Sequence, residues 1–257
     1  MKSELLDCEI AYSKCFCDCF EDQDVLRYRN SLLPDMYDHN FTYIKNHLDN
    51  SRIFELIQNE ISLRIAEHQN FCKAMFTFPM DDDVLPSMFS PKPEITKLGF
   101  YILNQKTHMD LKGNDDCSVL QINNSQRADH KTYYDLLLDK DRLGEDFCRR
   151  RATLHNSVYL NDSDVNAYIC YHNEKPVGAC ELYLHNGVAK IEDFTVLPGE
   201  QRKKYGTSIL KHLITLAYER KAQTIYLLTD EEDTAKEMYR KLGFIKTDEI
   251  TELMFLL

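Results

Sequence analysis

Hydrophobic and polar residues alternate with two different periods along the chain, which predicts helices and strands in a mixed α/β fold. One helix face is marked in the first hundred residues by Ile53, Leu56, Ile57, Ile61 and Ile65. Apolar runs at 71–78 and 98–103 predict strands, and residues 15–29 have strand character. A second helical pattern over 36–48 follows Pro34. We therefore predict the order β-α-α-β-β for this part of the chain.

A polar stretch over 106–116 separates this part from the rest of the chain. We place a domain boundary there, and predict a smaller N-terminal α/β domain over 1–112 and a second domain over 117–257. In the second domain, the patterns predict strands at 119–122, 167–171, 177–184, 188–197 and 224–228. Helices are predicted near 129–138, 141–157 and 234–242, and 201–219 is predicted to be a loop followed by a helix. The segments 245–247 and 253–257 can supply the last strands.

Composition and charge narrow the class of protein. The 257 residues are 43% hydrophobic and 28% charged, which is typical of soluble globular proteins, and the length favours two domains. The formal net charge is −11, and residues 1–116 hold 12 basic and 20 acidic side chains, a net −8. Because nucleic-acid binding requires a basic face, we expect no nucleic-acid partner.

The chain has no apolar run long enough to span a membrane, and its charged start does not resemble a signal peptide. We therefore expect no membrane partner. Nine cysteines, an odd number, favour free thiols in a reducing, cytoplasmic location.

The cysteines also raise the question of a metal site. Cys15, Cys17 and Cys19 alternate, so a strand would place them on one face, where together with Cys8 they could bind a metal. Their spacing lacks a C-x-x-C pair, which favours a thiol-lined apolar face instead. The run Asp81–Asp83 is more typical of a solvated loop than of a cation site. We expect no metal.

The strand predicted over 188–197 leads into a loop rich in positive charge, Gln201-Arg202-Lys203-Lys204, and then into a helix. Backbone N–H groups at a helix start are unpaired and carry partial positive charge, which favours a phosphate or pyrophosphate ligand. The small residues Gly206, Thr207 and Ser208 allow a ligand to approach the backbone closely. A capped helix with a solvated basic loop is the alternative that this segment alone leaves open.

Two short motifs occur in this part of the chain. One includes the loop, and the other follows the next predicted helix and strand. Val196-Leu197-Pro198 precedes the loop, in which Gln201, Lys204 and Gly206 are spaced as in a Gln/Arg-x-x-Gly-x-Gly/Ala pattern with lysine at one glycine. The run from Tyr239 to Phe244 has the pattern Tyr-x-x-x-Gly-Phe. In both motifs the chain resembles the GNAT superfamily of N-acetyltransferases. The resemblance implies a C-terminal GNAT fold, β-α-α-β-β-β-α-β-α-β-β, over 117–257.

By this resemblance, acetyl-CoA is the co-substrate and binds between the strands at 188–197 and 224–230, where they separate. The pantetheine arm is expected along Phe194, Thr195 and Val196. The pyrophosphate is expected on the loop and helix start, which comprise Gln201, Arg202, Lys203, Lys204, Tyr205, Gly206, Thr207 and Ser208, and Ala235 is a further cofactor contact. If the position of Lys204 requires a positive φ, lysine costs about 1 kcal/mol there.

The resemblance also assigns the catalytic groups. A primary amine attacks the thioester directly once a base has removed its proton, since a free alkylamine titrates near pH ~10. Tyr239 is at the family's position for the acid that protonates the departing thiolate, although it could simply pack on the sheet. Glu192 is the first candidate base and Asp193 the second, although both could simply form salt bridges. Counting by twos from Phe194, Glu192 shares its face, whereas Asp193 points to the opposite face unless a bulge intervenes.

The predicted function is therefore acetyl-CoA-dependent N-acetylation of a primary amine on a small molecule or protein. The β-α-α-β-β order of 1–112 is similar to the opening half of the same fold without its acetyl-CoA loop. We interpret this domain as a truncated relative that walls the acceptor cleft, and its negative charge favours a cationic acceptor. The alternative is a catalytically inactive CoA-binding or protein-interaction module. A monomer or a homodimer is expected.

Overall fold

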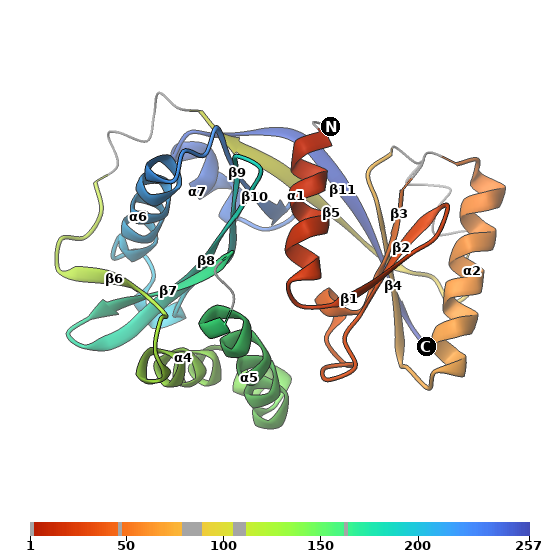
Figure 1. Ribbon diagram of the computed structural model, residues 1–257, viewed down its shortest axis with the longest axis horizontal. Coiled ribbons are helices and arrows are strands. Elements are labelled where there is room, and N and C mark those ends of the chain that lie inside the picture. Colours follow the sequence, from red (N-terminus) through yellow and green to blue (C-terminus); the bar gives the residue numbers. More distant parts are fainter. Residues whose placement is uncertain (1–2, 46–47, 79–88, 105–111, 162–163) are drawn as a thin grey trace.

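One mixed β-sheet runs through the whole protein (Figure 1). The computed structural model describes residues 3–45, 48–78, 89–104, 112–161 and 164–257. The strands of these residues are β1 (Asp18–Glu21), β2 (Val25–Arg29), β3 (Thr42–Ile44), β4 (Phe71–Phe76), β5 (Glu94–Leu103), β6 (Cys117–Gln121), β7 (Val165–His172), β8 (Lys175–His185), β9 (Val188–Val196), β10 (Thr224–Asp230) and β11 (Phe244–Leu256). Their order across the sheet is β1-β2-β3-β4-β11-β5-β10-β9-β8-β7-β6. The predicted mixed α/β fold is confirmed.

Helices cover both faces of this sheet. They are α1 (Ser3–Lys14), α2 (Asn50–Ala66), α4 (Ser125–Leu143), α5 (Glu145–Asn161), α6 (Tyr205–Glu219) and α7 (Ala235–Lys241), with 3-10 turns η1 (Tyr37–His39) and η3 (Pro198–Glu200). On β5, Tyr101 belongs to the core under α6 and α7, and Ile95 packs into the core under α2. These odd-numbered positions share a face, so the three helices lie on one side of the sheet. Phe100 faces the other side, where it shares a core with Leu5 and Cys8 of α1. In Figure 1, α1 lies between α5 and the N-terminal strands.

Strands β1–β5 form the N-terminal half of the sheet and β6–β11 the C-terminal half, and the two halves exchange their last strands. β3-α2-β4 and β9-α6-β10 are both parallel β-α-β units. β10 pairs with β5 from the N-terminal half, whereas β11 is inserted between β5 and β4 and pairs with both. The C-terminus therefore lies beside α2, in the N-terminal half (Figure 1). The division into domains 1–112 and 117–257 stays a prediction, because one sheet unites both segments.

Most of the predicted elements are present, but the last strand pair differs. A single strand, β11, with a bulge between Lys246 and Asp248, replaces the two strands predicted at 245–247 and 253–257. Its length has a physical reason, because it lies between β5 and β4 and pairs with β5 over Phe244–Met254 and with β4 over Thr251–Leu256.

The N-terminal prediction needs three further corrections. The helix predicted over 36–48 is wrong, because η1 and the short strand β3 occupy this segment. All three residues of β3 are buried, so the apolar spacing here reflects burial on both faces of a sheet rather than one helix face. Residues 15–29 contain two strands, which pair as the hairpin β1–β2. Helix α1 was not predicted.

The cysteine prediction changes with these elements. Cys15 and Cys17 lie in the turn between α1 and β1, so the three alternating cysteines do not share one strand face. All nine cysteines are free thiols. Within the described ranges, no three His, Cys, Asp or Glu side chains are grouped as a metal site would require. Asp81–Asp83 lie outside the described residues. No helix among the described residues is long and apolar enough to cross a membrane.

Candidate active site

Strands β9 and β10 separate halfway along their length. Their parallel pairing joins Val188–Ile191 to Thr224–Leu227 and then ends, while β9 continues to Val196 beside β8. The N–H of Leu197 donates to the carbonyl of Val177 on the β8 side at 3.0 Å. Because backbone groups alternate along a strand, the N–H of Val196 points to the opposite side, toward the gap that β10 leaves. An extended ligand can therefore pair with β9 there.

A β-bulge lies at the point of separation. Glu181 of β8 is opposite Glu192, but Ala179 is opposite Thr195, so β9 contains one extra residue. The extra residue is Asp193, with φ 46°. The bulge puts both candidate bases on the side of the sheet covered by α1, α4 and α5. Glu192 forms an ion pair with Lys190 there, and Asp193 forms one with Lys131 of α4.

The bulge also breaks the count by twos along β9. Phe194 packs in the core under α6 and α7, with its ring centroid 6.1 Å from that of Tyr239. The prediction that Glu192 shares a face with Phe194 is therefore wrong. The candidate acid and the candidate bases therefore lie on opposite sides of the sheet.

The loop after β9 leads into α6 with an open helix start. Gln201 donates its side-chain Nε2–H to the carbonyl of Val196 at 3.3 Å, which folds the loop back on the strand. Arg202 and Lys204 both have φ 66°. Lys204 is the N-cap residue and forms no side-chain cap, so the first amides of α6 stay available to a ligand. The position of Lys204 thus has the positive φ at which lysine is strained.

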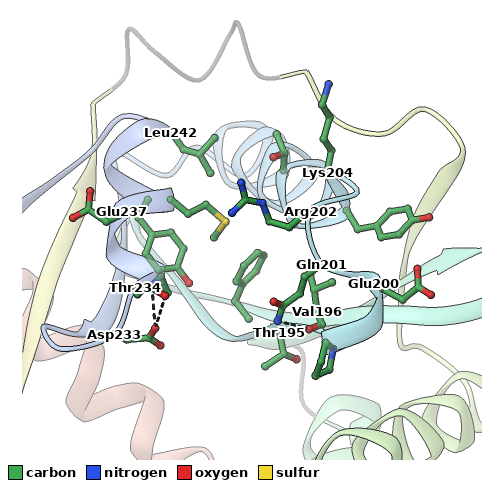
Figure 2. A pocket seen from close by; sticks show the side chains of 18 of the residues that line it. Thr195, Val196, Glu200, Gln201, Arg202, Lys204, Asp233, Thr234, Glu237 and Leu242 are labelled. Carbon is green, nitrogen blue, oxygen red and sulfur yellow. Dashed lines mark hydrogen bonds between the residues drawn. The ribbon is translucent and has the colours of Figure 1, made fainter.

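A cavity of about 810 Å³ lies between this loop, β9 and α7 (Figure 2). Neither Arg202 nor Lys204, which both line it, forms an ion pair with any described residue. A Cβ atom at Gly206 would lie 3.2 Å from the Phe194 ring, so glycine leaves room for close approach to the backbone here. The predicted cofactor residues that line the cavity are Phe194, Thr195, Val196, Gln201, Arg202, Lys204, Tyr205, Gly206, Thr207 and Ala235.

Two predicted cofactor residues, Lys203 and Ser208, do not line this cavity. Lys203 places its Nζ 2.8 Å from Glu200, and its carbonyl accepts a hydrogen bond from the Asn114 side chain. The Oγ of Ser208 accepts from the N–H of Asn114 at 2.7 Å. Both residues therefore hold the segment before β6 against α6.

Sequence reasoning missed part of the wall formed by α7. Thr234, Met238 and Leu242 line the cavity beside Tyr239. They recur every four residues, and this helical spacing is the signal that could have indicated them together. Asp233 lies just before α7, where its side chain accepts a hydrogen bond from the N–H of Ala235 (Figure 2).

Tyr239 has the surroundings of a neutral phenol. It is only 6% exposed and contacts the ring of Phe244 edge-on. Burial raises its pKa well above the usual range, and the negative charges of Glu192 and Asp233 raise it further. The side chain therefore keeps its proton at neutral pH and can act as a donor.

Glu192 forms an ion pair on the α1 side of the sheet. Its carboxylate lies 2.7 Å from the Nζ of Lys190, which also lies 2.7 Å from Glu9 of α1. The ring of Tyr12 covers the same ammonium group at 4.1 Å. Burial raises the pKa of Glu192 and the charge of Lys190 opposes this effect, but the net direction is upward. About a third of the side chain is exposed.

Asp193 shares its cation with a second carboxylate. Lys131 of α4 lies 3.2 Å from Asp193 and 2.7 Å from Asp135. Burial raises the pKa of Asp193, Lys131 lowers it, and the charges of Glu181 and Asp135 raise it again, with a net upward direction. Both candidate bases are thus ion-paired, and both hold protons more tightly than free carboxylates.

Sequence reasoning did not identify Glu9, Tyr12 or Glu181 near this site. Glu181 is a single acidic residue within the buried run 177–183, and a lone charge in a buried strand is the signal that could have indicated it. Nothing comparable marks Glu9 and Tyr12, because their position depends on how α1 packs on the sheet.

Comparisons with known proteins agree with this geometry. The sequence pattern of the acetyltransferase (GNAT) family matches residues 130–244. The chain is 22% identical over 233 residues to the uncharacterized N-acetyltransferase CgeE of Bacillus subtilis (strain 168), with 87% of this chain and 86% of the relative covered.

Solved structures share the fold over nearly the whole chain. One is a conserved protein of unknown function from Staphylococcus epidermidis, with TM-score 0.76, 19% identity and 93% of both chains covered. Another is a GCN5-related N-acetyltransferase from Kribbella flavida, with TM-score 0.71, 11% identity, and 99% of this chain and 95% of that chain covered. The separated strands and the basic loop agree with this match, in which residues 130–244 fit the acetyltransferase (GNAT) family.

Proposed function

We propose that this protein acetylates a primary amine with acetyl-CoA, by direct attack of the amine on the thioester. The observation that carries the proposal is the cavity, in which an uncapped helix start, two unpaired cations and the free edge of β9 adjoin Tyr239. Arg202, Lys204 and the first amides of α6 suit a pyrophosphate. The backbone of Phe194–Val196 suits the pantetheine arm, and acetyl-CoA supplies the activated acyl group.

The chain's own residues then provide proton transfer and charge stabilisation. Glu192 or Asp193 accepts the proton of the incoming ammonium group, and the raised pKa of both brings them closer to the working pH. The N–H of Val196 can stabilise negative charge on the thioester oxygen. Tyr239, which keeps its proton, donates to the departing sulfur. We propose Glu192 first as the base and Asp193 second.

The acceptor is proposed to be cationic. Glu9, Glu192 and one shared lysine carry a net negative charge on the side of the sheet from which the amine would approach. Asp193 and Asp135 share a second lysine in the same way. Each group therefore keeps one uncompensated negative charge, which attracts an alkylammonium group.

The N-terminal half is proposed to be a degenerate copy of the same fold. Its order α1-β1-β2-β3-α2-β4-β5 parallels α5-β7-β8-β9-α6-β10-β11, apart from α7. The strand pairings agree as well, because β3 and β4 are parallel as β9 and β10 are. In this proposal the half keeps the framework and supplies α1 to the wall of the acceptor side.

A second candidate is a CoA-binding module without turnover. The observation in its favour is that both Glu192 and Asp193 already form ion pairs. In this case the cavity binds CoA, but no carboxylate removes the proton of an amine.

A thiol-release assay with acetyl-CoA and a panel of mono-, di- and polyamines tests the two candidates. Turnover that falls about 100-fold in Tyr239→Phe, with CoA affinity unchanged, is expected for the enzyme. Tyr133→Phe is the matched control, because Tyr133 lies exposed on α4. Glu192→Gln and Asp193→Asn identify the base by which of them loses the rate. CoA binding without turnover on any amine would leave only the module.

A further inference from the structure

A fully buried carboxylate lies directly behind the bulge in β9. Glu181 of β8 is 0% exposed and stands opposite Glu192 in the β8–β9 register. Tyr12 of α1 donates its hydroxyl to Glu181 at 2.6 Å, and Tyr159 of α5 donates to the other carboxylate oxygen. One acidic side chain thus connects the sheet to helices from both halves of the protein.

The hydrogen bonds around Glu181 extend to a histidine. His155 places its Nδ1 3.0 Å from the Tyr159 hydroxyl. The Tyr159 hydroxyl has one hydrogen, which it donates to Glu181. The Nδ1 of His155 must therefore carry a hydrogen and donate it to the oxygen of Tyr159. The described lysines nearby are bound elsewhere, because Lys131 pairs with Asp135 and Asp193. Glu181 is therefore stabilised by donors, and no lysine or arginine of the described residues pairs with it. His155, whose Nδ1 lies 3.7 Å from the carboxylate, pairs with its charge only when the imidazole is protonated.

We infer that Glu181 is a positioning residue of the proposed acetyl-transfer site, which anchors α1 over the bulge and sets a fixed negative charge behind Glu192 and Asp193. The inference rests on the proposed function for its role in the reaction. A buried negative charge makes a neighbouring carboxylate hold its proton more tightly, which strengthens that carboxylate as a base. The raised pKa of Glu192 and of Asp193 agrees with this, because the charge of Glu181 contributes to both.

Glu181 itself must be ionised for this role. Burial raises its pKa, but His155 and the hydroxyls of Tyr12 and Tyr159 outweigh burial and lower it to about 2. The groups that face the three carboxylates from the surrounding elements are Glu9 and Tyr12 on α1, Lys131 and Asp135 on α4, Arg151, His155 and Tyr159 on α5, Lys190 on β9 and Tyr239 on α7.

The test compares Glu181→Gln with Tyr12→Phe in the full-length protein. Glutamine keeps the size and the acceptor oxygen but removes the charge. We expect the acidic limb of the kcat/KM profile for the amine to move down by about one pH unit, while KM for acetyl-CoA stays unchanged. Tyr12→Phe keeps the charge and removes one anchor, so the limb should stay in place while KM for the amine rises. A folded Glu181→Gln protein with an unmoved acidic limb would overturn the inference.

A second measurement does not depend on turnover. Carbon-13 NMR of labelled carboxyl groups follows the titration of Glu181, Glu192 and Asp193 in the wild-type protein. We expect Glu181 to be ionised throughout neutral pH and the other two to titrate above the usual carboxyl range. A protonated Glu181 at pH 7 would overturn the inference even if Glu181→Gln did not fold. If no amine is acetylated but the titrations are as expected, the proposed function fails and the electrostatic role of Glu181 stands.

Discussion

The two parallel β-α-β units of this protein differ most at the turn between strand and helix. At the β9–α6 turn, the N-cap residue Lys204 is in the left-handed region and forms no side-chain cap. At the β3–α2 turn, the N-cap residue Asp49 is extended, and its carboxylate accepts the N–H of Arg52 at 2.9 Å. One helix start is thus open and surrounded by cations, while the other is closed by a carboxylate.

The comparison separates the fold from the binding site. Both units pair their strands in parallel and bury one helix face, so the framework alone does not create an anion site. At β3–α2, the charge of Arg52 is also neutralised, by Asp24 at 3.0 Å and Glu55 at 2.9 Å. At β9–α6, Arg202 and Lys204 line the cavity. We infer that the loss of a cap, together with unpaired cations, makes such a turn able to bind a pyrophosphate.

The largest expected effect comes from giving α6 the cap of α2. Lys204→Asp should weaken CoA binding by about 100-fold, because it removes a cation, occupies helix amides and adds a negative charge. Aspartate tolerates a positive φ, so the loop should keep its shape. Isothermal titration calorimetry with CoA measures the change.

Lys204→Gly is the matched control for this substitution. It removes the same cation without adding a charge, and it relieves the positive φ of 66°. We expect an affinity loss of about tenfold. If Lys204→Asp bound CoA as tightly as Lys204→Gly, capping would not distinguish the two turns.

The second effect is a loss of stability at acidic pH, and it tests the contact between the two halves. Two buried imidazoles stack where the N-terminal half meets α5. His39 of the N-terminal half stacks on His155 of α5, with ring centroids 5.1 Å apart, and the Nδ1 of His39 has no partner in the described structure. Burial lowers the pKa of His39 to about 3, and the neighbouring His155 contributes to the shift.

The sign follows from proton binding. Between pH ~6.5 and ~3, the unfolded chain binds a proton at His39 that the folded protein excludes, so stability is full above this window and falls as the pH decreases. Between pH 6.5 and 5, this histidine should remove about 2 kcal/mol of unfolding free energy. Urea unfolding of wild type and His39→Phe at several pH values measures the difference. His68→Asn, at an exposed histidine, is the control, and equal slopes for wild type and His39→Phe would contradict the prediction.

The sequence predicted the loop and helix of the β9–α6 turn well because its signals are local. A basic loop, small residues and an amphipathic helix follow one another within 201–219, and nothing distant is needed to interpret them. The same holds for Tyr239, whose place depends on helical spacing and the closing Gly243, with φ 94°. Ten of the predicted cofactor contacts therefore line the cavity.

The features that the sequence did not predict depend on distant contacts. The bulge at Asp193 is defined by the register with β8, so a count along β9 alone put Glu192 on the wrong face. Helix α1 has only Leu5 and Cys8 fully buried, and its role depends on the contacts of Glu9 and Tyr12 with the sheet. The strand exchange between β5 and β11 likewise has no local signal, because either strand could pair with its own half.

A smaller effect should distinguish two neighbouring cations of the β9–α6 turn. Arg202 lines the cavity, whereas Lys203 pairs with Glu200 outside it. Arg202→Gly should weaken CoA binding by about tenfold and reduce its dependence on salt, since glycine accepts the same positive φ. Lys203→Ala should change the affinity less than twofold. Equal losses for both variants would mean that general positive charge, and not the lining of the cavity, attracts CoA.

The smallest effect concerns the closed turn, where the cap should stabilise the fold and have no influence on CoA. Asp49→Ala removes the hydrogen bond to the N–H of Arg52 and should cost about 1 kcal/mol of unfolding free energy, measured by urea unfolding. Asp49→Asn is the control, because asparagine caps equally well without the charge and should keep the stability. CoA affinity should be unchanged in both variants, since Arg52 remains neutralised by Asp24 and Glu55. If Asp49→Ala bound a second CoA molecule, the cap alone would have kept this turn closed. Unpaired cations such as Arg202 and Lys204 would then not be required for CoA binding at a β-α turn.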